Sequence, residues 1–306
     1  PRHRLVLAAP APLAELAMLT AAVDELLPTP APTSRDWPAL DWPHPPPAVA
    51  VNLHGRGPQS TSVLRALHPS TLLTHAHGEG PGPRWNCELH EVRRWCRLLE
   101  YFGIATDPSD LALSHPPVPS PAPAAVIVHP GCAFAARRWP LDRYATVARR
   151  LARAGPRLVV TGSAAERPRA IRLAAEAGLP EDSVLAGRTT LGQLADLVAN
   201  ASLLISGDTG IAHLATAYGT PSVVLFGPVP PRRWGPPPER PQHVALWAGR
   251  TGDPFADRPD DGLLRITTNE VLDVAERLIG RSRRAGELNS GFAPATAGEF
   301  VRRLGV

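Results

Sequence analysis

This sequence has few cysteines, no apolar run of membrane length and no internal repeats. Its 306 residues include three cysteines, Cys87, Cys96 and Cys132, and no Cys-x-x-Cys pair. That spacing argues against zinc motifs and a disulfide framework, and it fits a reducing, cytoplasmic compartment. No apolar run reaches the ~18 residues of a membrane helix. No unit of about 20–50 residues recurs, which excludes solenoids and propellers.

The start of the chain shares features with a secretory signal peptide, because an arginine precedes an apolar run with small residues. Pro10, Pro12 and Glu15 interrupt that run. We therefore predict a strand over residues 4–9, followed by a helix that starts at Pro12.

The charge pattern argues against nucleic-acid binding. The formal net charge is +4, and the positive charges are arginines scattered along the chain. A nucleic-acid-binding surface needs clustered positive charge, whereas scattered arginines are compatible with a small anionic substrate. Hydrophobic residues make up 43% and charged residues 20% of the chain, as in soluble globular proteins.

The first part of the chain alternates short apolar runs with loops. Strands are predicted over residues 4–9, 48–53 and 71–74, with a further short one within 22–27. Residues 28–47, rich in proline and tryptophan, are predicted to be a loop. The strongest helical pattern covers residues 88–102, and its apolar stripe is formed by Leu89, Val92, Trp95, Cys96, Leu99 and Phe102.

A proline-rich linker over residues 113–124 divides the chain, because its prolines disfavour both helix and sheet. We predict an N-terminal domain over residues 1–122, a larger domain over 123–285 and a C-terminal tail over 286–306. In the larger domain strands and helices alternate, which predicts a parallel sheet. Its strands are expected at 125–129, 157–161, 184–186, 202–206 and 222–226.

The helices of this part are marked by their ends. Two helices are expected at residues 141–154 and 165–177. A third starts at a Thr190–Gln193 capping box and runs to residue 199, and a fourth covers residues 268–279, with its cap near Asn269 and Glu270. Residues 281–291 are expected to be mobile, and residues 299–304 to form a last helical turn or two.

Residues 202–235 contain the most informative pattern. A buried strand over residues 202–206 is broken by the turn at 207–210, which opens a short helix that stops at Gly219. The free N–H groups at the start of a helix bind anions, and a glycine there allows a ligand to come close to the backbone.

Three side chains surround that helix start. Thr209 offers a hydroxyl, Asp208 can accept from a ribose or sugar hydroxyl, and His213 lies on the same face as Gly210. The alternative is equally compatible with the spacing: Asp208 only caps the helix, and His213 is an ordinary surface histidine.

Residues 208–228 read D-T-G-x-x-H-L-A-x-A-x-G-T-P-x-V-x-L-F-G-P, and Trp234-Gly235-Pro236 follow. This ordered pattern resembles glycosyltransferase family 9, the ADP-heptose:lipopolysaccharide heptosyltransferase-like enzymes. The resemblance implies an α/β fold of the GT-B type, in which two Rossmann-like domains face each other across a cleft. It also implies transfer of a sugar from a nucleotide-diphosphate donor such as ADP-heptose to an acceptor hydroxyl with inversion.

The same resemblance implies where the donor binds. Turns at His129-Pro130-Gly131, at 161–163 and at 207–210 line one edge of the sheet. Arg137 matches the basic residue of a K/R-x-W-P motif and would pair with a phosphate. Glu166 stands where relatives often place an acidic residue that reaches the nucleotide, although it could simply complement a helix dipole. No Asp-x-Asp occurs in the chain, and no metal or other cofactor is expected.

The catalytic base is the missing part. The family's expected base is an aspartate in a Gly-Asp turn after the first strand, and this chain, which begins at Pro1, has no such turn. The first domain is therefore expected to be incomplete, and no catalytic residue is assigned. A non-catalytic nucleotide-sugar-binding protein, or a fragment that lacks the catalytic base, is the alternative, and another GT-B enzyme such as a nucleotide-sugar epimerase is a third hypothesis.

The acceptor is expected to be a glycan or glycolipid of the cell envelope, with at most peripheral membrane contact and no nucleic acid. Asn52, His54 and Arg56 follow the strand over residues 48–53 and would face the acceptor, unless they are merely exposed residues of a Gly-rich turn. His75, His77 and His90 lack the spacing of metal ligands and are predicted to be loop histidines.

Overall fold

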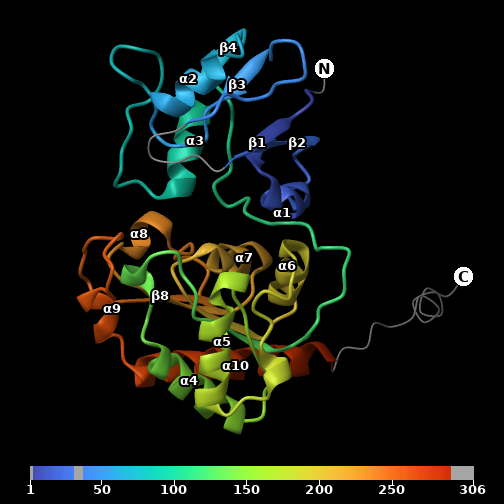
Figure 1. Cartoon of the computed structure of the whole chain (residues 1–306), viewed down its shortest axis with the longest axis vertical. Coiled ribbons are helices and arrows are strands. Elements are labelled where there is room, and N and C mark those ends of the chain that lie inside the picture. The colour runs from blue at the N-terminus through green and yellow to red at the C-terminus, as the bar shows by residue number, and fades with distance from the viewer. Residues whose placement is uncertain (1–2, 31–36, 291–306) are drawn as a thin grey trace, which may run out of the picture.

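The computed structural model describes residues 3–30 and 37–290 and contains three parallel sheets with helices around them (Figure 1). Two of the sheets have two strands each and belong to the first part of the chain. The strands are β1 Val6–Pro10 beside β2 Glu25–Thr29, and β3 Val49–Val51 beside β4 Thr71–Leu73. The helices between and after them are η1 Ala11–Leu13, α1 Ala14–Leu19, α2 Gln59–Arg65 and α3 Glu91–Tyr101.

The third sheet has five parallel strands in the order β6-β5-β7-β8-β9. These strands are β5 Val126–His129, β6 Leu158–Val160, β7 Leu203–Gly207, β8 Ser222–Phe226 and β9 His243–Trp247. The helices around it are η2 Ala135–Arg137, α4 Leu141–Arg153, η3 Ala164–Glu166, α5 Arg167–Ala177, η4 Glu181–Ser183, α6 Leu191–Ala199, α7 Gly210–Tyr218, α8 Pro231–Trp234, α9 Asp261–Arg265 and α10 Thr268–Ser290.

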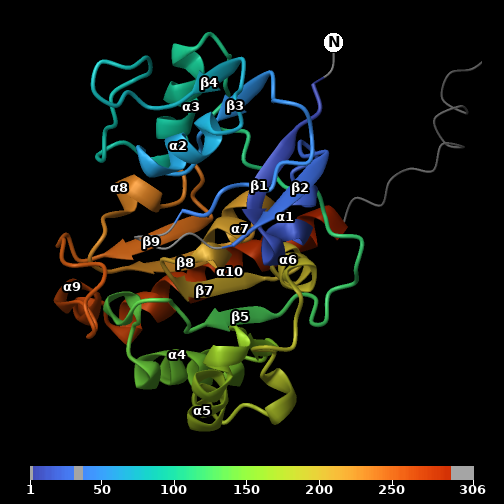
Figure 2. The ribbon, with the colours of Figure 1, turned by 45° about the horizontal axis from the view of Figure 1, so that its top comes forward.

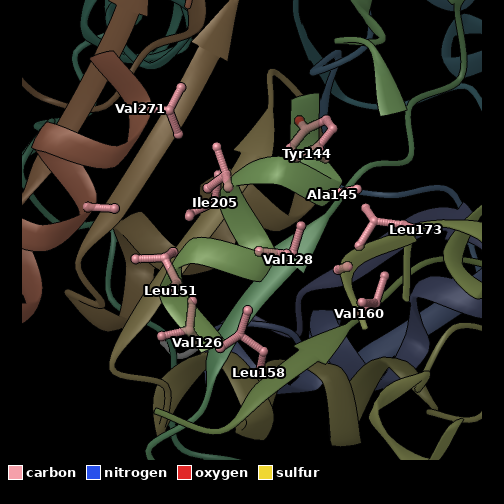
Figure 3. Packing of buried hydrophobic residues seen from close by; sticks show 14 of the residues in the cluster. Val126, Val128, Tyr144, Ala145, Leu151, Leu158, Val160, Leu173, Ile205 and Val271 are labelled. Atoms are coloured by element: carbon pink, nitrogen blue, oxygen red, sulfur yellow. The ribbon is translucent and has the colours of Figure 1, made fainter. Parts of the chain in front are cut away.

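The two faces of the five-stranded sheet are covered by different helices because side chains alternate along each strand. Val126 and Val128 of β5 point to one face and pack with residues of α4, α5 and α10 (Figure 3). Ile127, between them, points to the other face and packs with α6 and α7. Leu19 of α1 belongs to this second cluster, so the first part of the chain contributes directly to the core of the second.

The β1–β4 strands and α1–α3 form one lobe, and the five-stranded sheet forms the other (Figures 1 and 2). Several hydrogen bonds join the lobes. His90 Nε2 donates to Gly235 O over 2.9 Å, and Tyr218 Oη donates to Ser114 O over 3.1 Å. The Glu15 carboxylate accepts from the backbone N–H of Gly192 at the start of α6.

The local signals read from the sequence are confirmed at several helix ends. Thr190 and Gln193 form a capping box at α6, and Gly219 ends α7 with a left-handed φ of 68°. The start of the chain is a strand and a helix, as predicted in preference to a signal peptide.

Other boundaries differ from the prediction. α10 continues to Ser290, well beyond the predicted end at residue 279, so residues 281–290 are helical. Its first turn is capped by Thr267, whose hydroxyl accepts from Glu270 N. In α3, Leu98 is fully buried although it lay outside the predicted stripe. The helical turns expected at 299–304 lie outside the described residues, and the domain boundaries remain a prediction.

Within the part of the chain that the structure describes, none of the helices is both long and apolar enough to cross a bilayer.

Candidate functional site

The carboxyl ends of β5, β6 and β7 meet at one edge of the sheet. Strand register pairs His129 with Ser206 and Val128 with Val160, so the three following turns start side by side. His129 Nδ1 lies 2.9 Å from Thr161 Oγ1, and the Cys132 thiol donates to Asp208 O over 3.8 Å. The three turns predicted to line one edge are therefore in contact.

Asp208 is a buried carboxylate at this edge and does not cap α7. The N-cap position belongs to Thr209, and no side chain bonds to the N–H groups of the first turn. The Asp208 carboxylate instead faces Arg137, with 3.6 Å between Oδ2 and Nη1. Its backbone N–H donates to Leu225 O, which fixes the turn to β8. The capping interpretation of Asp208 is therefore wrong.

Electrostatics near Asp208 reflect its burial. Loss of water raises the pKa of the Asp208 carboxyl, while the charges of Arg137 and His213 oppose that rise. His213 projects from α7 beside it and is exposed at the surface, yet the protein packed around its ring lowers its pKa against the pull of Asp208. His90, from the other lobe, adds to the lowering of the His213 pKa.

The two neighbouring arginines after β5 have different surroundings. Arg138 Nε donates to Cys132 O over 2.7 Å, and its Nη2 donates to Ala133 O, so this guanidinium ties down its own loop. Arg137 turns toward Asp208, and its Nε is buried without a partner among the described residues. Of the two arginines, Arg137 therefore keeps donors for a further group.

Glu166 closes the site on the β6 side. Its Oε2 accepts from the backbone N–H of Ser163 over 2.8 Å and from the Ser163 hydroxyl over 2.9 Å. Burial alone would raise its pKa, but these bonds and the charges of His129 and Arg138 hold the pKa of Glu166 below its usual value. Burial lowers the pKa of His129, and the Glu166 charge opposes that change.

Gly131 is required by this arrangement. A Cβ at Gly131 would overlap the Glu166 carboxylate, so a larger residue cannot pass this point without displacing it. Gly210, in contrast, is exposed, and a Cβ there would have nothing within 4 Å. The start of α7 is thus open to a ligand. The N–H of Ala212 bonds to Thr209 O, so the donors that this helix start offers are the N–H groups that precede it.

Two further contributions to the site were not visible in the sequence. The loop over residues 253–261 supports Arg137, because Ala136 N donates to Ala256 O and Asp260 N donates to Ala136 O. His90, the N-cap of α3 in the other lobe, contributes to the electrostatics of His213. Both contributions link segments far apart in sequence, and no local pattern signals them.

The second candidate junction, after β3, is only partly a surface of free polar groups. Asn52 is buried, its Nδ2 donates to Ser60 Oγ and Thr61 Oγ1, and its Oδ1 accepts from His54 N. Asn52 therefore fixes the turn, while His54 and Arg56 are exposed. No cluster of three His, Cys, Asp or Glu side chains suited to a metal ion occurs in the described ranges.

Comparison with known proteins gives a consistent result. The family model described as glycosyltransferase family 9 (heptosyltransferase) matches residues 86–256. Lipooligosaccharide heptosyltransferase 2 of Haemophilus influenzae is 32% identical over 161 residues, which are 50% of this chain and 46% of that protein. Lipopolysaccharide heptosyltransferase 1 of Pseudomonas aeruginosa is 40% identical over 111 residues, 36% of this chain and 30% of that protein. The matched region spans less than half the length of these curated relatives.

Solved structures share the fold over most of the chain. A glycosyl transferase family 9 protein from Veillonella parvula superimposes with a TM-score of 0.69 at 20% identity, covering 91% of this chain and 88% of its own. An E. coli heptosyltransferase solved with ADP gives a TM-score of 0.63 at 17% identity, covering 91% of both chains. These likenesses confirm the expected GT-B fold of two Rossmann-like parts.

Proposed function

The chain belongs to glycosyltransferase family 9, and on that premise we propose that it transfers a sugar, heptose or a close relative, from a nucleotide-diphosphate donor to an acceptor hydroxyl. The observation that carries the proposal is the placement of Arg137 and Asp208 beside the open N-terminus of α7, with 3.6 Å between Nη1 and Oδ2. This sheet edge offers a cation and backbone N–H groups for the phosphates, and a carboxylate that accepts hydrogen bonds from sugar hydroxyls. These are the groups that bind a sugar diphosphate.

The proposed donor is ADP-heptose. Two E. coli structures of similar fold, one with ADP and one with ADP-2-deoxy-2-fluoro heptose, support this choice. In our proposal the diphosphate lies at the N–H groups of Thr209 and Gly210 and against Arg137. Asp208 accepts from a hydroxyl of the ribose or sugar, and His213 borders the same mouth. His129, Gly131 and Glu166 form the wall of the site on the β6 side.

The chemistry follows from the charge that develops on the leaving group. As the anomeric bond breaks with inversion, negative charge builds up on the departing diphosphate, and preorganised donors lower the barrier by stabilising that charge. The Arg137 guanidinium and the first-turn N–H groups are the donors available here, so the proposed reaction proceeds without a metal. The residue that takes the acceptor proton is not assigned.

We further propose that the acceptor is a glycan or glycolipid of the cell envelope and that the enzyme works in the cytoplasm with at most peripheral membrane contact. The names of the curated relatives support an acceptor in lipopolysaccharide or lipooligosaccharide. Three free cysteines support a reducing compartment.

A calorimetric panel of ADP-, GDP- and UDP-sugars tests the donor, with Asp208→Ala and Arg137→Ala as site variants and the exposed Arg150→Ala as a matched control. We expect binding of an ADP-sugar that both site variants weaken and the control preserves. Donor consumption that requires acceptor supports transfer. Tight binding without turnover supports the nucleotide-sugar-binding alternative, and equal binding by all variants contradicts the assigned site.

A further inference from the structure

The segment that carries Arg137 is attached at both of its ends to one side chain, Arg169 of α5. Arg169 Nε donates to Pro130 O over 3.3 Å, and its Nη2 donates to Trp139 O over 3.1 Å. Pro130 directly follows β5, and Trp139 stands two residues after Arg137. A single guanidinium therefore fixes the beginning and the end of residues 130–139, which we call the Arg137 segment.

Between its two ends the Arg137 segment passes close to Asp208. The Cys132 thiol donates to Asp208 O over 3.8 Å, and a Cβ at Gly207 would lie 3.1 Å from Arg137 O. The backbone of Arg137 thus packs directly on the end of β7. Because the backbone decides where a side chain starts and points, the hold on this segment determines whether Arg137 reaches the donor in the right geometry.

The head group of arginine is suited to holding two carbonyls at once. The guanidinium is planar and presents its N–H donors in a rigid fork, so two bonds fix the spacing of the two acceptors. A lysine ammonium keeps the charge, but it is a compact point that does not reproduce the fork. Arg169 is half-buried, and burial lowers the pKa of its guanidinium, so the two carbonyls replace hydrogen bonds to water that burial removes.

The start of α5 is a firm base for this attachment. Arg169 lies in the first turn of the helix, and Ala170 and Leu173 behind it are completely buried in the core cluster shared with α4. Glu166, just before the helix, lies against the same segment at Gly131. The start of α5 therefore contacts the Arg137 segment at its two ends and at the glycine between them.

We propose that Arg169 is a positioning residue for the donor: by bonding Pro130 O and Trp139 O, it holds the Arg137 segment in the shape that directs Arg137 to the diphosphate. The inference rests on the proposed function, since Arg169 acts through Arg137 at the proposed donor site. Its contribution comes from the geometry of the fork and not from its charge.

Calorimetry with ADP tests the proposal on the wild type, Arg169→Lys and a matched control, Arg240→Lys. Arg240 is also half-buried, and its Nη1 and Nη2 donate to Thr216 O and Ser109 O over 2.9 and 3.0 Å, outside the Arg137 segment. Both variants keep the charge and lose the fork, so we expect a similar fall in unfolding temperature. ADP affinity should fall about 10-fold in Arg169→Lys alone.

A double-mutant cycle shows whether Arg169 acts through Arg137. Once Arg137→Ala is in place, adding Arg169→Lys should weaken ADP binding no further, because the two residues serve one contact. Losses that multiply overturn the positioning role, as does wild-type affinity of Arg169→Lys or an equal loss in Arg240→Lys. Wild-type affinity of Arg137→Ala, or no ADP binding by the wild type, instead contradicts the donor site itself and the inference with it.

A measurement on the wild-type protein covers the case in which Arg169→Lys fails to fold. Linkage is reciprocal, so if the Arg169 bonds favour ADP binding, ADP strengthens those bonds. In ¹⁵N spectra, saturating ADP should slow hydrogen exchange of the Arg169 Nε–H by about 3-fold or more. Exchange at Arg172, exposed on the same helix and bonded through Nε to Glu176, should not change. Unchanged exchange at Arg169 overturns the positioning role.

Discussion

Arg137 Nη1 and Asp208 Oδ2 lie 3.6 Å apart, close enough to attract and too far for a direct hydrogen bond. The two side chains come from turns after different strands, β5 and β7, that are neighbours in the sheet. Because the pair is not locked, both groups keep hydrogen-bonding capacity for a third molecule. A purely structural ion pair at this degree of burial would be expected to close up.

Arg137→Gln should weaken binding of a nucleotide diphosphate by about 10- to 100-fold, the worth of a charge-assisted hydrogen bond. Thermal unfolding should change less than in Arg138→Gln, since Arg137 Nε has no partner in the described structure and the contact of Nη1 with Asp208, at 3.6 Å, is longer than a hydrogen bond. Arg138→Gln should do the reverse and lower the unfolding temperature, because Cys132 O and Ala133 O lose their donor. Calorimetry and thermal melts of both variants check this, and loss of stability in Arg137→Gln alone would contradict it.

The Asp208→Asn variant distinguishes recognition of the donor's sugar from recognition of its phosphates. If Asp208 accepts from a donor hydroxyl, the variant should lose most of the extra affinity of a nucleotide sugar over the nucleoside diphosphate. ADP itself should bind as well or better, because a negative charge near the phosphates is removed. Titrations with ADP and an ADP-sugar measure the ratio. A parallel loss for both ligands would show that Asp208 acts only by holding the turn.

Gly131→Ala should destabilise the fold by about 1–3 kcal/mol, the usual cost of overpacking, because the new Cβ meets the Glu166 carboxylate. Adding Glu166→Ala should recover part of that loss, which a double-mutant cycle from chemical denaturation measures. Gly210→Ala is the matched control and should leave stability intact, since its Cβ has nothing within 4 Å. It should reduce donor affinity if the diphosphate lies against that backbone.

Acid should destabilise the protein through its buried histidines. Burial, helped by Arg240, lowers the pKa of His243 to about 4, below its ordinary value of 6.5. Between these values the unfolded chain takes up the proton and the folded chain does not, so this stabilisation is complete above pH 6.5 and is lost as the pH falls toward 4. The difference corresponds to roughly 3 kcal/mol.

His243→Asn should therefore flatten the dependence of unfolding free energy on pH over that interval. Some acid sensitivity should persist, because His75, His129 and His213 also have lowered pKa values. The exposed His77→Asn serves as the control and should keep the wild-type slope. Denaturant unfolding at several pH values measures it, and identical slopes for His243→Asn and the wild type would refute the assignment.

Local physics made the central strands of the second part predictable, whereas β9 was not predicted and residues 184–186 contribute only an isolated bridge at Val184. The buried runs of β5, β7 and β8 have the apolar character of strands covered on both faces. The Thr190–Gln193 capping box marks a helix start through side-chain-to-backbone hydrogen bonds, and Gly219 marks a helix end through its left-handed φ. The length of α10 was harder to predict. Its last turns are polar and arginine-rich, without an apolar stripe to mark them as helix.

The details of the candidate site depend on contacts between turns that are far apart in sequence, and no local sequence pattern predicts such contacts. Spacing could not decide whether Asp208 caps α7 or faces a cation, because that depends on where the loop after β5 places Arg137. The approach of Glu166 to Gly131 follows from the pairing of β5 with β6. The resemblance of the motif selected Arg137 over Arg138, and the structure supports that choice through the bonds that occupy Arg138.

The bond from Gly192 N to the Glu15 carboxylate has a consequence for dissecting the protein. α6 packs on the larger sheet, yet a donor in its first turn is satisfied by a side chain of α1, and Leu19 fills the same apolar cluster. A fragment made of residues 123–285 would lose both. The two lobes are therefore not autonomous modules, and the sheet that carries Asp208 depends for part of its integrity on its neighbour.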